Sequence, residues 1–290
     1  MDSLLRMHGI RRVLRSAVSS RSLRIRYRVR KYIAINARLV NRKASDWRFS
    51  DAAIDKLVTV DPLHVAAYQD EVIDHPGIVP YGSSRTWPKL LGGSERDEYV
   101  LANAGRVVGG DWDQQCIPIE DAEMYRLLHD RFIKGMHWDE IPVFQSFMDT
   151  VLHGNRVWHS RSTAELRRRA DYVDALFESI SKCGCSKDPG HHNPLDAITL
   201  NVGRDGALIF SSTGAHHRFM LARLLGLGAV QARILIRHEL WQQRREAFRR
   251  GFFSDAKTGE SACLLEAYHP DLQDLVSRAG ANDESKRRWR

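Results

Sequence analysis

A short run of residues with phosphate-binding chemistry lies in the last third of the chain: Thr213, Gly214, His216, His217 and Arg218. The apolar residues that follow have helical spacing, so the two histidines and the arginine fall in the first turn of a helix. That turn has backbone N–H groups without intrahelical partners and a dipole that favours negative charge, and an adjacent arginine can hold a phosphate through two hydrogen bonds. The run therefore predicts a phosphate pocket.

A second interpretation of the same run gives it no ligand. The side-chain oxygen of Ser212 or Thr213 would cap the helix, and one of the two histidines would pack into the core. The local pattern leaves both interpretations open.

Two carboxylates separated by one tryptophan follow the glycine pair Gly109 and Gly110. In a strand, Asp111 and Asp113 would face the same side. One or two carboxylates together with phosphate oxygens commonly hold Mg²⁺, and either aspartate is also a candidate general base. The alternative is a turn anchored by Trp112, because Asp and Gly are common turn residues.

The residues around the phosphate-binding run form a compact pattern of strands and one helix. The predicted elements are strands over 197–202, 207–210 and 230–236, a tight turn over 204–206, and a helix over 215–225 that ends at Gly226. This pattern would bring the end of the second strand directly to the helix start.

Two amphipathic helices are expected between residues 119 and 181. One carries an apolar stripe from Met124 to Phe132. The other runs to Ile180 and is capped by Ser162 or Thr163.

The region before these helices is rich in chain-breaking residues. Pro and Gly are frequent over 74–97, which indicates a loop or an insertion. After it, residues 99–101 and 106–108 flank Ala104-Gly105 and predict a small hairpin.

The positive charge of the chain is concentrated at its start. The net charge is +8, but residues 1–43 alone hold 13 Lys and Arg residues against one acid, Asp2. Such a basic arm can lie on an anionic membrane surface or bind the phosphates of a nucleic acid, and it also resembles an organelle transit peptide. A solvated extension of the slightly acidic body is the fourth interpretation, and composition does not choose among them.

Composition also bears on location. The apolar runs are far shorter than the roughly 20 residues that cross a bilayer. Four cysteines are too few for a disulfide-rich secreted scaffold, and the start of the sequence has no uninterrupted apolar signal segment. We expect a cytoplasmic protein, with peripheral contact to a membrane through the basic arm as an option.

The segment from residue 197 to 240 resembles the core of the ParB/sulfiredoxin-like superfamily, with strand, turn, strand, a Gly-x-His-Arg type of helix start and a closing strand. A wider set of motifs over residues 55–245 is similar, in the same order, to an uncharacterised "ParB-like nuclease domain" family of archaeal and bacterial proteins. These motifs are Asp61-Pro62, residues 107–113, Phe132, Gly135, Trp138, residues 204–206, His216-His217-Arg218 and residues 237–242.

The resemblance implies an α+β fold in which helices pack on a mixed sheet. The ParB/sulfiredoxin-like domain would span residues 55–245, with the helical insertion at about 119–181. Residues 1–43 would form the basic arm, and residues 246–290 a C-terminal helical extension with a basic tail.

Nucleotide binding is the activity that the resemblance implies. In this superfamily, partition proteins bind CTP, sulfiredoxins use ATP, and a related enzyme phosphorylates free serine. Carried over, Gly214, His216, His217 and Arg218 would surround the phosphates. Sulfiredoxins have a catalytic cysteine where this chain has His216, and no helix-turn-helix pattern follows Trp241, so sulfinic-acid reduction and chromosome partition are both disfavoured.

We therefore predict an ATP- or CTP-dependent phosphotransferase that uses Mg²⁺ and acts on a small-molecule or glycan-related acceptor. The catalytic or metal-binding groups would be Asp111, Asp113 and His217, and the acceptor would lie against Arg237 and His238. Two alternatives stay open: a nucleic-acid-binding protein or nuclease, and a non-catalytic nucleotide sensor.

Overall fold

A computed structural model of the chain describes residues 48–50, 57–65, 67–69, 75–78, 95–185, 197–213, 215–254 and 268–276. The basic arm over residues 1–43, most of the loop over 74–97, Gly214 and the tail from residue 277 lie outside the described residues.

A mixed sheet forms the centre of the fold. Its strands are β1 (Arg48–Phe49), β2 (Val58–Val60), β3 (Ala67–Gln69), β4 (Arg106–Val108), β5 (Ile117–Pro118), β6 (Ile198–Val202), β7 (Leu208–Ser211) and β8 (Val230–His238). The order is β1-β4-β8-β6-β7-β3-β5, and β2 also pairs with β8. The sheet contains both parallel pairs (β4–β8, β6–β8, β3–β7) and antiparallel pairs (β1–β4, β2–β8, β6–β7, β3–β5), which confirms the predicted α+β class.

The longest strand, β8, organises the sheet. Along one edge it pairs with β6, from Ile198↔Ala232 to Val202↔Arg237. Along the other edge its start pairs with β2 and its end pairs with β4. Seven of its nine side chains in succession, from Ala232 to His238, are buried, as expected for a strand covered on both faces.

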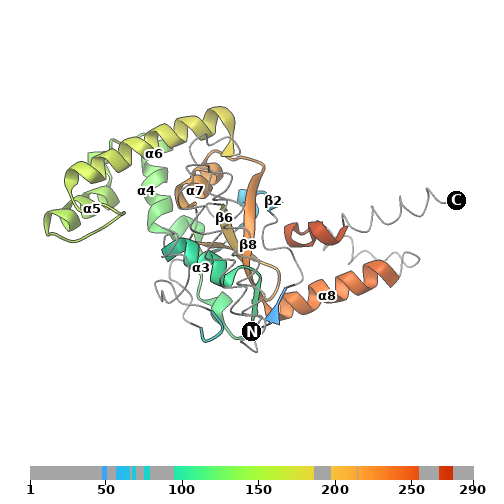
Figure 1. Cartoon of the computed structure of the whole chain (residues 1–290). Helices are drawn as coiled ribbons and strands as arrows, with labels where there is room; N and C mark the ends of the chain where they lie inside the picture. Colours follow the sequence, from blue (N-terminus) through green and yellow to red (C-terminus); the bar gives the residue numbers. More distant parts are fainter. Residues whose placement is uncertain are drawn as a thin grey trace, which may run out of the picture.

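Six helices of nine or more residues accompany the sheet in the described part of the chain. They are α3 (Glu95–Asn103), α4 (Glu123–Phe132), α5 (Pro142–Leu152), α6 (Thr163–Cys183), α7 (His216–Leu224) and α8 (Glu239–Ser254). Short 3₁₀ turns lie between these helices and strands: Pro62–His64, Trp112–Gln114, Ile119–Asp121, Trp138–Glu140 and Pro270–Leu272. Figure 1 shows α4, α5 and α6 together on one side of the molecule, with α7 between them and the strands and α8 on the far side.

Apolar side chains cover both faces of the sheet. Phe210 and Ile234 belong to a large cluster shared with α4, α5, α6 and α7. Their neighbours Ile209 and Leu235 face the other way, into a smaller cluster shared with α3 and Trp112. This reversal between consecutive residues is the period of two of a strand, so the sheet separates two helical layers.

The turn between β6 and β7 lies where the sequence predicts it and depends on a glycine. Gly206 has a φ of +97°. A Cβ atom there would lie 2.6 Å from the ring of Trp241, so both the backbone conformation and the packing exclude a larger residue.

Several predicted elements are confirmed, and others need correction. The helix start at Ser162 is confirmed, because its side chain accepts a hydrogen bond from the Glu165 amide. The hairpin over residues 99–108 is wrong: 99–101 belong to α3, and only 106–108 form a strand. Sequence patterning also missed α5, which begins at Pro142 and buries Phe144, Phe147 and Val151.

Among the described residues, none of the helices has the length and hydropathy of a membrane-spanning segment.

Candidate functional site

The first turn of α7 has no side-chain cap. The residue before it is Ala215, whose φ of 51° lies in the left-handed region and whose side chain has no hydrogen-bonding group. The hydroxyl of Thr213 lies instead 2.8 Å from the Ser211 hydroxyl and 3.3 Å from that of Thr199, within the sheet. Capping by Thr213 is therefore wrong, and the residue that precedes the helix supplies no side-chain cap to its first turn.

The two histidines of α7 have different environments. His216 packs inward against Tyr68 and Phe210, with ring centroids 5.5 and 5.6 Å apart. This part of the packing interpretation is confirmed. His217 lies beside the indole of Trp158, which donates a hydrogen bond of 2.7 Å from Nε1 to Nε2 of His217.

A pocket of about 260 Å³ opens at this helix start, and we name it the α7 pocket. Its lining comes from α3, α4, α6, α7 and the turn over 157–160, together with Ser212 and Thr213. Six of the lining residues carry cationic or titratable nitrogen groups: Arg96, His159, Arg169, His216, His217 and Arg218. None of the described lining residues is acidic.

The backbone is strained around the same pocket. In the described part of the chain, three residues other than glycine have positive φ: Trp158 (48°), His159 (58°) and Ala215 (51°). All three line the α7 pocket. Such conformations cost about 1 kcal/mol or more each and concentrate at binding and catalytic sites.

Aromatic rings hold part of the positive charge in place. The guanidinium of Arg169 lies 6.0 Å from the ring of Trp158 and 5.7 Å from the ring of Tyr172. Burial lowers the pKa of Arg169, although the group stays charged at neutral pH. Burial, together with the positive charges of His216, Arg169 and His159, holds the pKa of His217 well below its usual value. The arginines therefore supply the permanent charge of the pocket.

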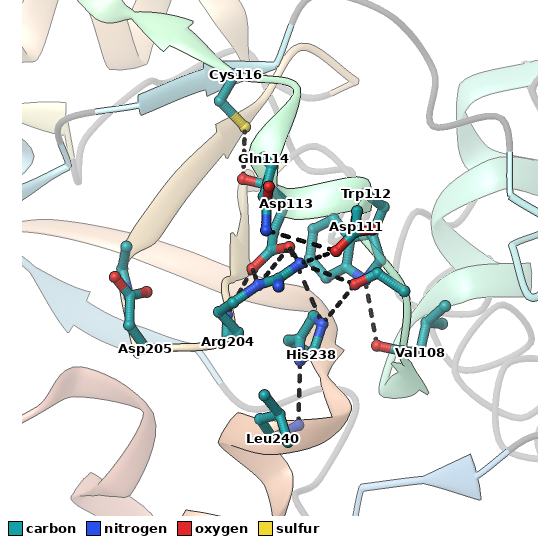
Figure 2. Close-up of polar contacts among 12 residues, drawn as sticks. Val108, Asp111, Trp112, Asp113, Gln114, Cys116, Arg204, Asp205, His238 and Leu240 are labelled. Atoms are coloured by element: carbon teal, nitrogen blue, oxygen red, sulfur yellow. Dashed lines mark hydrogen bonds and ion pairs between the residues drawn. The ribbon is translucent and has the colours of Figure 1, made fainter.

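The aspartates of the Gly-Gly-Asp-Trp-Asp run lie elsewhere and bind an arginine. They are not in a strand: Asp111 precedes the 3₁₀ turn Trp112–Gln114 that contains Asp113. Asp111 is 78% exposed, whereas Asp113 is 4% exposed. Arg204 reaches both, with contacts of 2.8 Å to Asp111 and 2.7 Å to Asp113 (Figure 2).

Arg204 determines the chemistry of this cluster. Burial alone would raise the pKa of Asp113, but the hydrogen bonds from Arg204 outweigh it and hold the pKa below its usual range. Both carboxylate oxygens of Asp113 accept from Arg204, so a Mg²⁺ ion would have to displace the guanidinium. As placed, the two aspartates do not fit a Mg²⁺ ion, and their role as metal ligands stays a prediction. No group of three His, Cys, Asp or Glu residues that could hold a metal ion occurs among the described residues.

His238 completes this Arg204 cluster, which consists of Asp111, Asp113, Arg204 and His238. The amide of Leu240 donates to Nδ1 of His238, so Nε2 carries the proton and donates to the carbonyl of Gly110 at 2.8 Å (Figure 2). His238 is buried and occupied by these backbone contacts.

Arg237 is buried in a second ion-pair group, which we name the Asp271 cluster. Arg237 donates two hydrogen bonds to Asp271, which also accepts from Trp241. Arg245 binds the backbone of Asp271 and forms a bidentate pair with Asp274. These contacts hold residues 268–276 against α8 and β8.

The predicted site residues therefore divide between two ends of the sheet. Because β7 runs antiparallel to β6, its end at Ser211 returns to the start of β6, and α7 begins there. Arg204 follows β6, and His238 ends the parallel strand β8. About 13 Å of strand lies between the two ends, at roughly 3.3 Å per residue. Thr213, His216, His217 and Arg218 share the α7 pocket, whereas Asp111, Asp113, Arg237 and His238 are at the opposite end.

Sequence reasoning missed the pocket residues that come from other elements. Arg96, Trp158, His159 and Arg169 carry no local motif, and their neighbours in sequence are ordinary helix or turn residues. Of these, only Trp158 is conspicuous in the sequence, and a tryptophan more often serves packing than function.

Comparison of the chain with models of known protein families, with curated proteins and with solved structures found no match.

Proposed function

We propose that the α7 pocket binds a phosphate-bearing small molecule, with a nucleotide as the first candidate. The observation that carries this proposal is that Arg96, Arg169 and Arg218 line one pocket together with the first turn of α7. Helix-start amides and guanidinium groups are both common protein partners of a phosphate. The resemblance to nucleotide-binding ParB/sulfiredoxin-like proteins points to the same helix start.

The pocket also has side chains of the types that bind the base of a nucleotide. Trp158 and Tyr172 line it beside Arg169, and aromatic and guanidinium planes are common stacking partners of a base. Its volume of about 260 Å³ is near the lower limit for small-molecule sites, which favours a ligand that is only partly enclosed.

The proposal is binding, and phosphoryl transfer stays a further prediction. The carboxylates foreseen for Mg²⁺ and for acceptor activation lie at the other end of the sheet and bind Arg204. A nucleotide sensor without turnover and a phosphotransferase whose acceptor group comes from elsewhere are both compatible with this geometry.

The test is isothermal titration of the full-length protein with ATP, CTP, GTP and pyrophosphate, each with and without Mg²⁺. We expect Arg218→Ala and Arg169→Ala each to weaken binding about tenfold or more, because each removes a charge-assisted contact. Arg168→Ala is the matched control, since Arg168 is the exposed neighbour of Arg169 on the same helix.

Unchanged affinity in Arg218→Ala would remove the proposal. If none of the four ligands bound, salt-dependent binding to DNA would become the measurement to make, because phosphate contacts to nucleic acid weaken steeply with salt.

A further inference from the structure

Trp158 connects the two strained segments of the α7 pocket. It lies in the tight turn closed by the bridge Val157↔Ser160, and its ring packs against Trp138, Phe144 and Phe147. These aromatic contacts hold the indole ring in place, and its Nε1 atom lies 2.7 Å from Nε2 of His217 in the first turn of α7. Trp158, which has a positive φ, is thus hydrogen-bonded to α7, the helix that follows the second positive-φ position, Ala215.

The direction of this hydrogen bond fixes the proton of His217. An indole N–H can only donate, so Nε2 of His217 must offer a lone pair. The histidine is then neutral, and its proton is on Nδ1. Free histidine prefers the other tautomer, so the bond from Trp158 selects a state that the side chain would otherwise disfavour.

The charged and titratable groups around His217 act in the same direction. They are His216 and Arg218 on α7, Arg169 and Tyr172 on α6, His159 in the turn, and Arg96 on α3. All except Tyr172 are cationic or can become so, and a proton added to His217 would repel them as well as break the bond to Trp158.

We propose that Trp158 is a positioning residue that keeps His217 as the neutral Nδ1–H tautomer, so that the pocket presents this N–H to a phosphate ligand throughout the neutral pH range. The inference rests on the proposed function only for the identity of the ligand. Its consequence is that the affinity of the pocket depends on its arginines and not on the titration of His217.

The first test needs no ligand. Nitrogen-15 spectra of the imidazole groups, with His217 assigned by its loss in His217→Gln, report which nitrogen is protonated. We expect protonated Nδ1 and unprotonated Nε2 from pH 8 to pH 6 in the wild type. In Trp158→Phe we expect the proton to move to Nε2 while the ring stays neutral, because the burial and the neighbouring positive charges that lower the pKa of His217 are unchanged. Trp138→Phe is the control, because its indole is in the same aromatic cluster but donates to Asp174.

The second test measures the Kd of pyrophosphate for the variants at one pH, which cancels the titration of the ligand and of the other histidines. Trp158→Phe should raise this Kd about fivefold, because the Nε2–H tautomer of His217 would turn a lone pair instead of an N–H group toward the phosphate. In the His217→Gln background the change Trp158→Phe should alter Kd by less than about twofold, since glutamine has no such tautomers.

A wild-type His217 protonated on Nε2, or charged at pH 7, would overturn the inference. So would a Trp158→Phe variant whose His217 keeps the Nδ1–H tautomer unchanged. Failure of the proposed function gives a different result: the expected tautomer in the spectra but no binding of ATP, CTP, GTP or pyrophosphate.

Discussion

Arginines gather at both ends of the central strands, but their surroundings differ. At the ends of β6 and β8, Arg204 binds the buried Asp113 and Arg237 binds the buried Asp271, so the charges balance within the chain. At the start of α7, arginines and histidines converge on a pocket whose described lining contains no acid. The first arrangement stabilises the fold without a ligand, whereas the second is suited to an anion from outside.

The backbone differs in the same way. The positive-φ residues other than glycine in the described chain all line the α7 pocket. A chain that keeps such conformations gives up stability at that position, which is common where a site must be held ready for a ligand. The comparison therefore predicts that substitutions at the paired end change stability and that those at the pocket change binding.

The largest effect is expected at Asp271, whose side chain is 1% exposed. Asp271→Ala would leave Arg237 buried without its carboxylate, and we expect the free energy of unfolding to fall by about 3–5 kcal/mol. Urea denaturation measures this loss. The exposed Asp149 on α5 provides a control, and Asp149→Ala should stay within about 0.5 kcal/mol of the wild type. Equal losses in the two variants would contradict a special role for the Asp271 cluster.

Arg204→Ala should have the next largest effect. It leaves Asp113 buried and unpaired, but Arg204 itself is about a third exposed, so we expect a loss of about 2 kcal/mol. The deficit relative to wild type should shrink as the pH falls, because the neutral carboxylic acid tolerates burial better than the carboxylate. Denaturation at several pH values checks both points, and a deficit independent of pH would show that packing, not charge, is lost.

Mild acid should distinguish the two ends of the sheet. His217 has a folded-state pKa below its ordinary value of 6.5, so the unfolded chain binds more protons and stability falls as the pH drops below about 6.5. Asp113 and Asp271 have lowered pKa values, and their contribution is lost only when the pH falls below about 4. Between pH 7 and pH 5.5 the wild type should lose about 1 kcal/mol more than His217→Gln. Identical pH profiles for the two proteins in that range would refute this assignment.

The smallest effect is expected from Ala215→Gly. Glycine relieves the left-handed strain but has more freedom in the unfolded chain, so the net gain should not exceed about 1 kcal/mol. The same change at Ala164, an exposed residue in the first turn of α6, should instead cost about 0.5–1 kcal/mol. Thermal unfolding of both variants gives the comparison, and a loss at residue 215 as large as that at 164 would mean that the position carries no strain.

Local patterns predicted the elements that depend on local physics. The strands and helix over residues 197–238 agree within two residues, because alternation, a turn glycine and a helical stripe all lie within that segment. The segment over 99–101 was misread because Tyr99 and Val100 favour strands, whereas packing against the sheet makes them part of α3. Pro142 begins α5, which no sequence pattern predicted, and the first helical turn tolerates a proline.

Only some of the residues that line the α7 pocket could be predicted from the sequence, because the others reach it through tertiary packing. His217 and Arg218 are recognisable from the helix start that they occupy, a local feature. Arg96 and Arg169 reach the same pocket from α3 and α6 through tertiary packing that no short pattern encodes. Asp113 could not be separated from the pocket until the register of β6 and β7 was known, because strand direction decides at which end of a sheet a loop lies.

The position of β8 has a consequence for the order in which the chain can fold. Without it, the described strands fall into the pair β1–β4, the set β6-β7-β3-β5, and β2 alone. Residue 238 therefore has to be synthesised before these groups of strands can form one sheet. Until then, strand edges such as that of β6 have no partner strand and stay exposed. We expect the nascent chain to be a client of chaperones until β8 emerges, and arrest of translation before and after residue 238 should change its sensitivity to protease.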